Sequence, residues 1–262
     1  MQKIKKLLSD AFGDNINYLD SIESIGFLQK EDSFVVYDGH EPVSVLFTKK
    51  YPLNLDSHMV WADYVYYVAT EEKHRNRGLM RNLFKESLND LKSRGGDCAV
   101  IIPAEQKLFK FYSEFGFETA FYVRKKVYLP CGSGRNIYIP SSEEAKKFYP
   151  RYYDIYGTRN NTLFKTEQLF YMSVDENLLD SESYSVLSGG EDLAFAKLGD
   201  IIEIREYIGN DPDGFAKSVA DKYQKKTVMS MMTDGRDFPV GMILRYNGGN
   251  DVPPLFLDNM LN

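Results

Sequence analysis

The feature that most constrains this chain is the junction of two apolar patterns between residues 58 and 94. Residues 58–70 (HMVWADYVYYVAT) form a long run rich in aromatic and β-branched side chains, which predicts a strand. From residue 79 to residue 94, apolar side chains recur every three or four positions, which predicts an amphipathic helix. The turn between them, residues 71–78, is basic and contains one glycine. The strand therefore leads directly into the helix, and the chain must combine both types of element.

Similar patterns place the other elements of residues 1–130. An uninterrupted apolar run at residues 98–102 is typical of a strand that is covered on both faces. Asp38-Gly39 is a hairpin signal between two apolar runs. We expect helices over residues 2–12 and 105–115, and strands over residues 33–37, 43–48, 98–102 and 121–129.

The run Pro130-Cys-Gly-Ser-Gly134 is the best linker candidate, so we expect one domain over residues 1–130 and another over 131–262. In the second part, Asp211 and Pro212 are typical of the first turn of a helix. Both parts show the succession hairpin, strand, helix, strand, which indicates an internal repeat. The elements expected here are helices over 142–153, 161–172 and 211–224, and strands over 184–187, 193–198, 201–208, 227–232 and 240–246.

Composition indicates a globular protein. The 262 residues are 43% hydrophobic and 27% charged, and no apolar run approaches the roughly 18 residues of a membrane helix. The N-terminal apolar stretch is too short and interrupted for a signal peptide. Two cysteines and three scattered histidines form neither a disulfide framework nor a zinc spacing. We therefore expect a cytoplasmic protein that needs no metal and no membrane partner.

The negative charge lies in the second part of the chain. Residues 131–262 hold 14 Lys and Arg against 20 Asp and Glu, which accounts for the whole net charge of −6. This distribution argues against a nucleic-acid partner. It is compatible with a cationic partner, although a solvated acidic surface is the favoured interpretation.

The turn before the helix at residue 79 has the chemistry of an anion site. The first amides of a helix have no partner within the helix, and the helix dipole adds positive charge there. Gly78 allows close backbone approach. Lys73, Arg75, Arg77 and Arg81 lie in a stretch without an acidic residue, which suits a pyrophosphate. An ordinary connection with a solvated basic face would have the same pattern.

Two motifs resemble those of one enzyme family. Arg75-Asn-Arg-Gly78-Leu-Met80 resembles the Arg/Gln-x-x-Gly-x-Gly/Ala loop of the GNAT superfamily of N-acetyltransferases, with Met80 where Gly or Ala is usual. Phe111-Tyr-Ser-Glu-Phe-Gly-Phe117 resembles the Leu-Tyr-x-x-x-Gly-Phe segment of the same family. Their order and context match over about residues 20–130. The resemblance implies an α+β fold in α/β/α layers, with a mixed, mostly antiparallel sheet in each module.

The resemblance also implies roles for individual residues. Acetyl-CoA would lie, as co-substrate, between two splayed parallel strands at residues 58–70 and 98–102. The backbone of Val68, Ala69 and Thr70 would pair with the pantetheine arm. An amine would attack the thioester directly, in a ternary complex. The amides that would hold the pyrophosphate are those of Arg75, Asn76, Arg77, Gly78, Leu79, Met80 and Arg81.

Tyr112 matches the family position whose hydroxyl protonates the leaving thiolate, a task that suits a phenol. It also shares an apolar stripe with Phe111 and Phe115, so a core position is the alternative. The base is harder to place. Asp63, Glu71, Glu72 and His74 lie near the relevant strand, but strand alternation favours a solvent-facing Asp63. Cys98 is assigned to packing.

The second part lacks a phosphate loop, and its helix start at residues 210–215 (NDPDGF) is acidic. It resembles the degenerate second module of tandem GNAT proteins such as the enhanced intracellular survival family. We expect it to cover the substrate side of the first module without binding CoA. In that family the terminal carboxylate enters the active site, which makes Asp258 or the C-terminus a further hypothesis.

The function expected from the resemblance is acetyl transfer to a primary amine of a small molecule or peptide. The main alternative is an acyl-CoA-binding sensor without turnover, since Met80 departs from the motif and no clear base stands out. A structural module with a vestigial loop is a third hypothesis, and it predicts no CoA binding. The sequence leaves the acceptor, the acyl-chain preference and the oligomeric state open.

Overall fold

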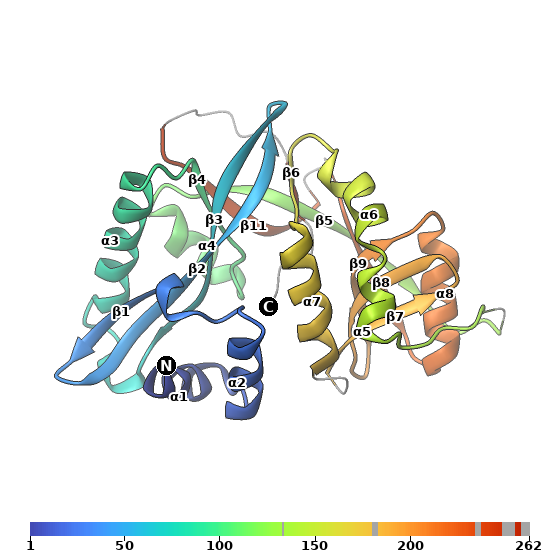
Figure 1. Cartoon of the computed structure of the whole chain (residues 1–262), viewed down its shortest axis with the longest axis horizontal. Coiled ribbons are helices and arrows are strands. Elements are labelled where there is room, and N and C mark those ends of the chain that lie inside the picture. The colour runs from blue at the N-terminus through green and yellow to red at the C-terminus, as the bar shows by residue number, and fades with distance from the viewer. Residues whose placement is uncertain (133, 180–182, 234–236, 248–254, 258–262) are drawn as a thin grey trace.

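The structure is a computed structural model that describes residues 1–132, 134–179, 183–233, 237–247 and 255–257. Its helices are α1 (Gln2–Phe12), α2 (Ile16–Ser24), α3 (Leu79–Ser93), α4 (Gln106–Ser113), α5 (Ser142–Lys146), α6 (Tyr149–Tyr152), α7 (Glu167–Leu179) and α8 (Pro212–Tyr223). Its strands are β1 (Ser33–Asp38), β2 (Glu41–Leu55), β3 (His58–Thr70), β4 (Cys98–Ile101), β5 (Glu118–Tyr128), β6 (Thr162–Leu163), β7 (Tyr184–Gly189), β8 (Asp192–Lys197), β9 (Ile202–Ile208), β10 (Thr227–Met232), β11 (Phe238–Arg245) and β12 (Phe256–Leu257). Figure 1 shows their arrangement.

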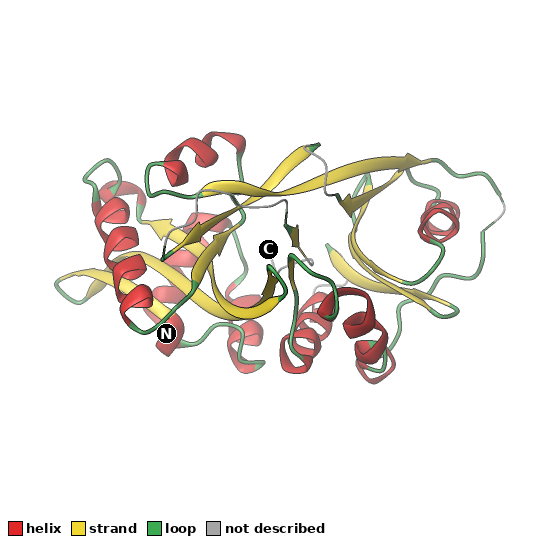
Figure 2. Cartoon of the chain, turned by 90° about the horizontal axis from the view of Figure 1, so that it is seen from above, coloured by secondary structure: helices red, strands yellow, loops and turns green. Residues whose placement is uncertain are grey.

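All the described strands belong to one sheet. The strand order is β12-β6-β2-β3-β4-β11-β5-β10-β9-β8-β7, and β1 pairs with β2 beside this path. Most neighbours are antiparallel, while β3 and β4, β9 and β10, and β6 and β12 run parallel. Helices lie on both sides of the strands, as seen in Figure 2. The expected α+β fold with a mixed, mostly antiparallel sheet is therefore confirmed.

The two parts of the chain exchange strands. β11 lies between β4 and β5 and is antiparallel to both, with Ile243 opposite Val100 on one side and Glu118 on the other. In turn, β5 lies between β11 and β10. The parallel pair β3–β4 is thus continued by β11 and β5, and the pair β9–β10 by β5 and β11. The strand order is therefore symmetric about the β11–β5 pair, while the internal repeat and the division at residue 130 remain predictions.

The predicted strand 58–70 coincides with β3, and the predicted helix 79–94 corresponds to α3. The helix predicted over residues 161–172 is wrong at its start, because β6 occupies Thr162–Leu163 and α7 begins at Glu167. The helix predicted over residues 142–153 is divided into α5 and α6. Pro150 lies at the start of α6, where its missing N–H does not break a helical hydrogen bond. α2 has no counterpart among the predicted helices.

The sheet carries a separate apolar core on each face of its first part. On one face, α1 and α2 pack on large rings of β2 and β3, including stacked Tyr64 and Tyr66 with ring centroids 5.7 Å apart. On the other face, α3 and α4 bury Phe84 and Tyr112 against β4 and β11. Within the described parts of the chain, no helix has both the length and the apolar character needed to cross a membrane.

Candidate active site

The parallel strands β3 and β4 separate halfway along β3. They pair from Ala62 opposite Cys98 to Val65 opposite Ile101, where β4 ends, while β3 continues to Thr70. The other edge of β3 stays paired with β2 but contains a bulge, at which Tyr67 has a φ of 49°. The expected splayed pair is therefore present, and beyond Val65 no described strand pairs with the β4 side of β3.

A cavity of about 460 Å³ opens where the two strands separate. Both parts of the chain contribute to it, since β7 supplies Tyr184 and β9 supplies Arg205. The described residues that line it are Phe12, Asp14, Phe27, Tyr64, Val65, Tyr66, Tyr67, Val68, Ile101, Ile102, Ala104, Leu108, Tyr112, Tyr184 and Arg205.

The turn at residues 71–78 presents backbone amides to solvent. Asn76 and Gly78 both have left-handed backbones, with φ of 62° and 76°, and both are exposed. Gly78 is the N-cap of α3, and no described side chain caps this helix end. Consecutive amides in such a turn before a helix form a concave site for an anion. The geometry therefore suits the predicted pyrophosphate cradle.

The basic side chains of this turn differ in their contacts. Arg75 Nε donates to the Thr70 carbonyl at 3.1 Å, and Arg77 donates to the Lys73 carbonyl at 3.1 Å. Both remain largely exposed. Arg81 instead forms an ion pair with Glu114 at 2.7 Å, which joins α3 to the end of α4. We therefore expect Arg75 and Arg77, rather than Arg81, to reach a bound anion with their side chains.

The strand end that we predicted to pair with pantetheine is partly engaged. The Thr70 carbonyl accepts from Arg75, and the Ala69 carbonyl accepts from the Ser44 hydroxyl at 3.1 Å. Val68 lines the cavity. Of the three predicted residues, Val68 thus has the clearest position for the role. Met80 is half-buried and packs against the core below α3, so its long side chain points into the protein.

His74 holds the turn at residues 71–78 in place through two side-chain contacts. Its buried ring lies between Glu71, with Nδ1 2.7 Å from Oε2, and Asp38, with Nε2 3.2 Å from Oδ2. A hydrogen bond from Lys73 and a further one from His74 lower the pKa of Glu71. His74 therefore ties the turn to the β1–β2 hairpin, and both it and Glu71 are committed to internal contacts.

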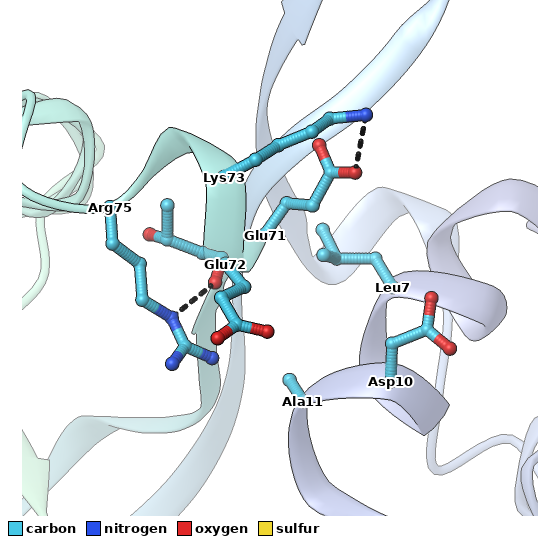
Figure 3. Close-up of a pocket in the computed structure, with 8 residues that line it drawn as sticks. Leu7, Asp10, Ala11, Glu71, Glu72, Lys73 and Arg75 are labelled. Carbon is cyan, nitrogen blue, oxygen red and sulfur yellow. Dashed lines mark hydrogen bonds and ion pairs between the residues drawn. The ribbon is translucent and has the colours of Figure 1, made fainter.

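A second pocket, of about 410 Å³, lies between this turn and α1. Figure 3 shows Glu72 and Arg75 on one side of it, facing Asp10 and Ala11 of α1 on the other. Thr70 also lines this pocket, which places it beside the end of β3. Its acidic and basic groups include the ion pair of Glu71 with Lys73, at 2.9 Å.

Tyr112 belongs to both the core and the cavity. Its ring packs on Phe84, with centroids 5.3 Å apart, and its side chain lines the cavity beside Leu108 and Ile101. Burial raises the pKa of Tyr112 to about 12, so the phenol is neutral and can donate a proton. No side chain among the described residues forms a hydrogen bond with its hydroxyl. The two alternatives weighed for Tyr112 are thus compatible.

The prediction that Asp63 faces solvent is wrong. Asp63 is 1% exposed, lies 2.9 Å from Lys50 Nζ, and accepts from the Tyr246 hydroxyl at 3.5 Å. Simple alternation fails because Lys50, Gly96 and Tyr246 pack against this carboxylate. Asp63 lies where the two strands are still paired, away from the cavity. Burial raises the pKa of the Cys98 thiol to about 12, which agrees with a packing role.

Sequence reasoning missed the carboxylate that does line the cavity. Asp14, between α1 and α2, accepts from the Tyr67 hydroxyl at 3.0 Å. Burial raises its pKa, and this hydrogen bond opposes the shift. No local pattern marks Asp14, because its position depends on how α1 packs against the bulge in β3. Asp258 and the C-terminus, for which a role in the active site is a hypothesis, lie outside the described residues.

The corresponding helix start in the second part is closed. Asp211 accepts from the Gly214 amide at 2.9 Å and caps α8, as the sequence predicts. Arg135 pairs with Asp211 at 2.7 Å and also holds Asp192. The protein's own carboxylate thus occupies the place that a phosphate would take.

Comparisons with solved structures agree with this fold. The chain resembles a conserved protein of Enterococcus faecalis V583 (TM-score 0.68, 13% identity, 93% of this chain and 70% of that one). It also resembles a GCN5-related N-acetyltransferase of Anabaena variabilis (0.66, 13%, 92% and 69%) and Eis1 of Mycobacterium abscessus (0.60, 11%, 94% and 71%). No curated protein matches the sequence. The N-terminal part of this chain, residues 1–120, matches the family model of the acetyltransferase (GNAT) domain.

Proposed function

We propose that the protein transfers the acetyl group of acetyl-CoA to a primary amine of a small molecule or peptide. One observation carries this proposal: Tyr112 lines the cavity that opens where β3 and β4 separate. The adjacent turn offers uncapped amides at the start of α3. A thioester held by this turn and by Val68 would place its sulfur inside the protein, within the region that Tyr112 lines.

The residues present fit the co-substrate. The amides of residues 76–81 would hold the pyrophosphate, with the exposed side chains of Arg75 and Arg77 adding positive charge. The apolar residues Val65, Ile101 and Leu108 would surround the pantetheine arm. Bound acetyl-CoA supplies the activated acetyl group, and the protein orients it and excludes water. The second part, with its helix start closed by Asp211, would cover the acceptor without binding CoA.

The acetyl transfer needs no covalent enzyme intermediate for its bonds and protons to balance. The acceptor ammonium first loses one proton to solvent, and its nitrogen then forms a bond to the acetyl carbon. The carbon–sulfur bond breaks, and the thiolate takes the Tyr112 proton and leaves as a thiol. The second proton released by the nitrogen restores the Tyr112 hydroxyl. A phenol whose pKa is raised to about 12 is a stronger base after donation, which favours this return.

The test is thiol release from acetyl-CoA with a panel of primary amines, together with calorimetric titration with CoA. The proposal expects CoA binding and amine-dependent thiol release. Binding without release for every amine would instead identify a sensor, and no binding would identify a structural module. Neither cysteine forms a disulfide bond, which supports the proposal of a cytoplasmic protein.

A further inference from the structure

The cavity is lined by one carboxyl group and one basic side chain. Of the fifteen described residues that line it, only Asp14 has a carboxyl group and only Arg205 has a basic side chain. They come from opposite parts of the chain and form no ion pair with each other. The other lining residues are apolar or aromatic, and the polar groups of their side chains are tyrosine hydroxyls.

Asp14 is arranged to receive a cation. It is half-buried, which raises its pKa, and its Oδ2 accepts from the Tyr67 hydroxyl at 3.0 Å, a bond that opposes this shift and favours the ionised carboxylate. Its Oδ1 has no hydrogen-bond donor among the described residues. Tyr67 is held at the bulge of β3 with a φ of 49°, so it fixes the carboxylate beside the point where the strands separate.

Arg205 is arranged to receive an anion. It is the extra residue at a register shift in β9, where Ile204 pairs with Ala196 and Glu206 with Phe195. Its guanidinium lies over the ring of Tyr184, with Cζ 5.3 Å from the centroid. It forms no ion pair with a carboxylate among the described residues. This contact with an aromatic face positions the guanidinium, whose N–H groups can still donate to an oxyanion.

The whole protein carries a net charge of −6, and its acidity lies in the second part. The charged side chain that this part contributes to the cavity is nevertheless basic. A carboxylate near Arg205, Glu176, is buried outside the cavity lining and accepts from the Tyr18 hydroxyl at 2.7 Å. The lining therefore does not match a polycation, which would meet Arg205 as a like charge.

We propose that the acceptor is a zwitterionic amine with an apolar body, which is the chemistry of an apolar amino acid. Asp14 holds its ammonium group, and Arg205 holds its carboxylate. This rests on the proposed acetyl transfer and narrows its substrate. The aromatic side chains of Phe12, Phe27 and Tyr64 surround the apolar body. The ammonium then lies beside Tyr67, where β3 and β4 part.

The test uses three probes with one phenyl body: L-phenylalanine, phenethylamine, which lacks the carboxylate, and 3-phenylpropionate, which lacks the ammonium. Thiol release is measured for the two amines, and calorimetry measures binding of all three to the full chain with and without CoA. The variant is Arg205→Gln. The matched control is Lys197→Gln, because Lys197 Nζ lies 5.9 Å from the same Tyr184 ring but does not line the cavity.

We expect kcat/KM for L-phenylalanine to exceed that for phenethylamine about tenfold or more, since one charge-assisted hydrogen bond is worth this factor. Arg205→Gln should abolish the preference, and Lys197→Gln should keep it. Equal turnover of the two amines, or equal effects of the two variants, would overturn the proposal.

If no amine releases thiol, the proposed transfer fails while the acceptor proposal is still decided by calorimetry. Binding of L-phenylalanine that exceeds binding of both half-probes and depends on Arg205 would support the site. Absence of that binding would overturn it.

Discussion

The hydroxyl of Tyr18, in α2, donates to Oε1 of Glu176, in α7, across a distance of 2.7 Å. The two residues are 158 positions apart in the chain, so this contact joins the N-terminal helices to the second part. Asn177 Nδ2 donates to the other carboxylate oxygen at 3.1 Å. Burial raises the pKa of Glu176 to about 7, and the Tyr18 hydrogen bond opposes this shift.

This shift predicts a pH-dependent stability. Between the ordinary value of 4.5 and about 7, the folded protein binds a proton at Glu176 that the unfolded chain releases. Its contribution to stability is complete below pH 4.5 and is lost as pH rises to about 7, a change of about 3 kcal/mol at most. Glu176→Gln should therefore unfold at higher urea concentration than the wild type above pH 7, with little difference at pH 4.5.

The control for this experiment is Glu167→Gln. Glu167 lies in the same helix and also accepts a tyrosine hydroxyl, from Tyr171 at 2.7 Å, but at the surface. Its substitution should shift the urea midpoint equally at both pH values. The same pH-independent shift for Glu176→Gln would contradict the assignment of the raised pKa to this carboxyl.

The exchange of β5 and β11 predicts that neither part of the chain folds alone. Without β11, residues 1–130 would expose the edges of β4 and β5 and lose the buried Met242 and Ile243 from the two cores. We expect this fragment to be insoluble or to show no cooperative thermal transition. Co-expression with residues 131–262 should restore a soluble complex. A fragment of residues 1–130 that unfolds cooperatively would support two independent domains instead.

Local sequence determines the parts of the site that are local in the chain. The strand at 58–70, the helix from 79 and the turn between them follow from apolar periodicity and one glycine, and all were predictable. The environment of Asp63 could not be predicted, because it depends on Tyr246, directly after β11, which lies 183 positions later in the chain. The same holds for Asp14 and Arg205, whose common cavity requires both the bulge in β3 and the packing of β9. Short strands such as β6, with two residues, carry no periodicity to detect.

Gly78 allows a test of the anion cradle. Replacing it with alanine keeps the amide but strains a backbone with a φ of 76°, at a cost of about 1 kcal/mol. Gly39→Ala is the matched control, since Gly39 has a φ of 61° in the β1–β2 hairpin and equally open surroundings. Both variants should lose similar stability in thermal unfolding. In calorimetry, only Gly78→Ala should weaken CoA binding, and equal affinities for the two variants would exclude this turn from the site.

Tyr112→Phe tests the proton donor itself. The ring packing on Phe84 is retained, so CoA affinity and thermal stability should stay close to those of the wild type. Loss of the hydroxyl removes the proton for the thiolate, and kcat should fall about a hundredfold, within the usual range for a general acid. Tyr246→Phe is the control, because Tyr246 is comparably buried, at 7% against 5% exposure, but contacts Asp63 outside the cavity. Thiol release that is equally fast in both variants would assign Tyr112 to the core alone and leave the donor to a solvent proton entering through the cavity.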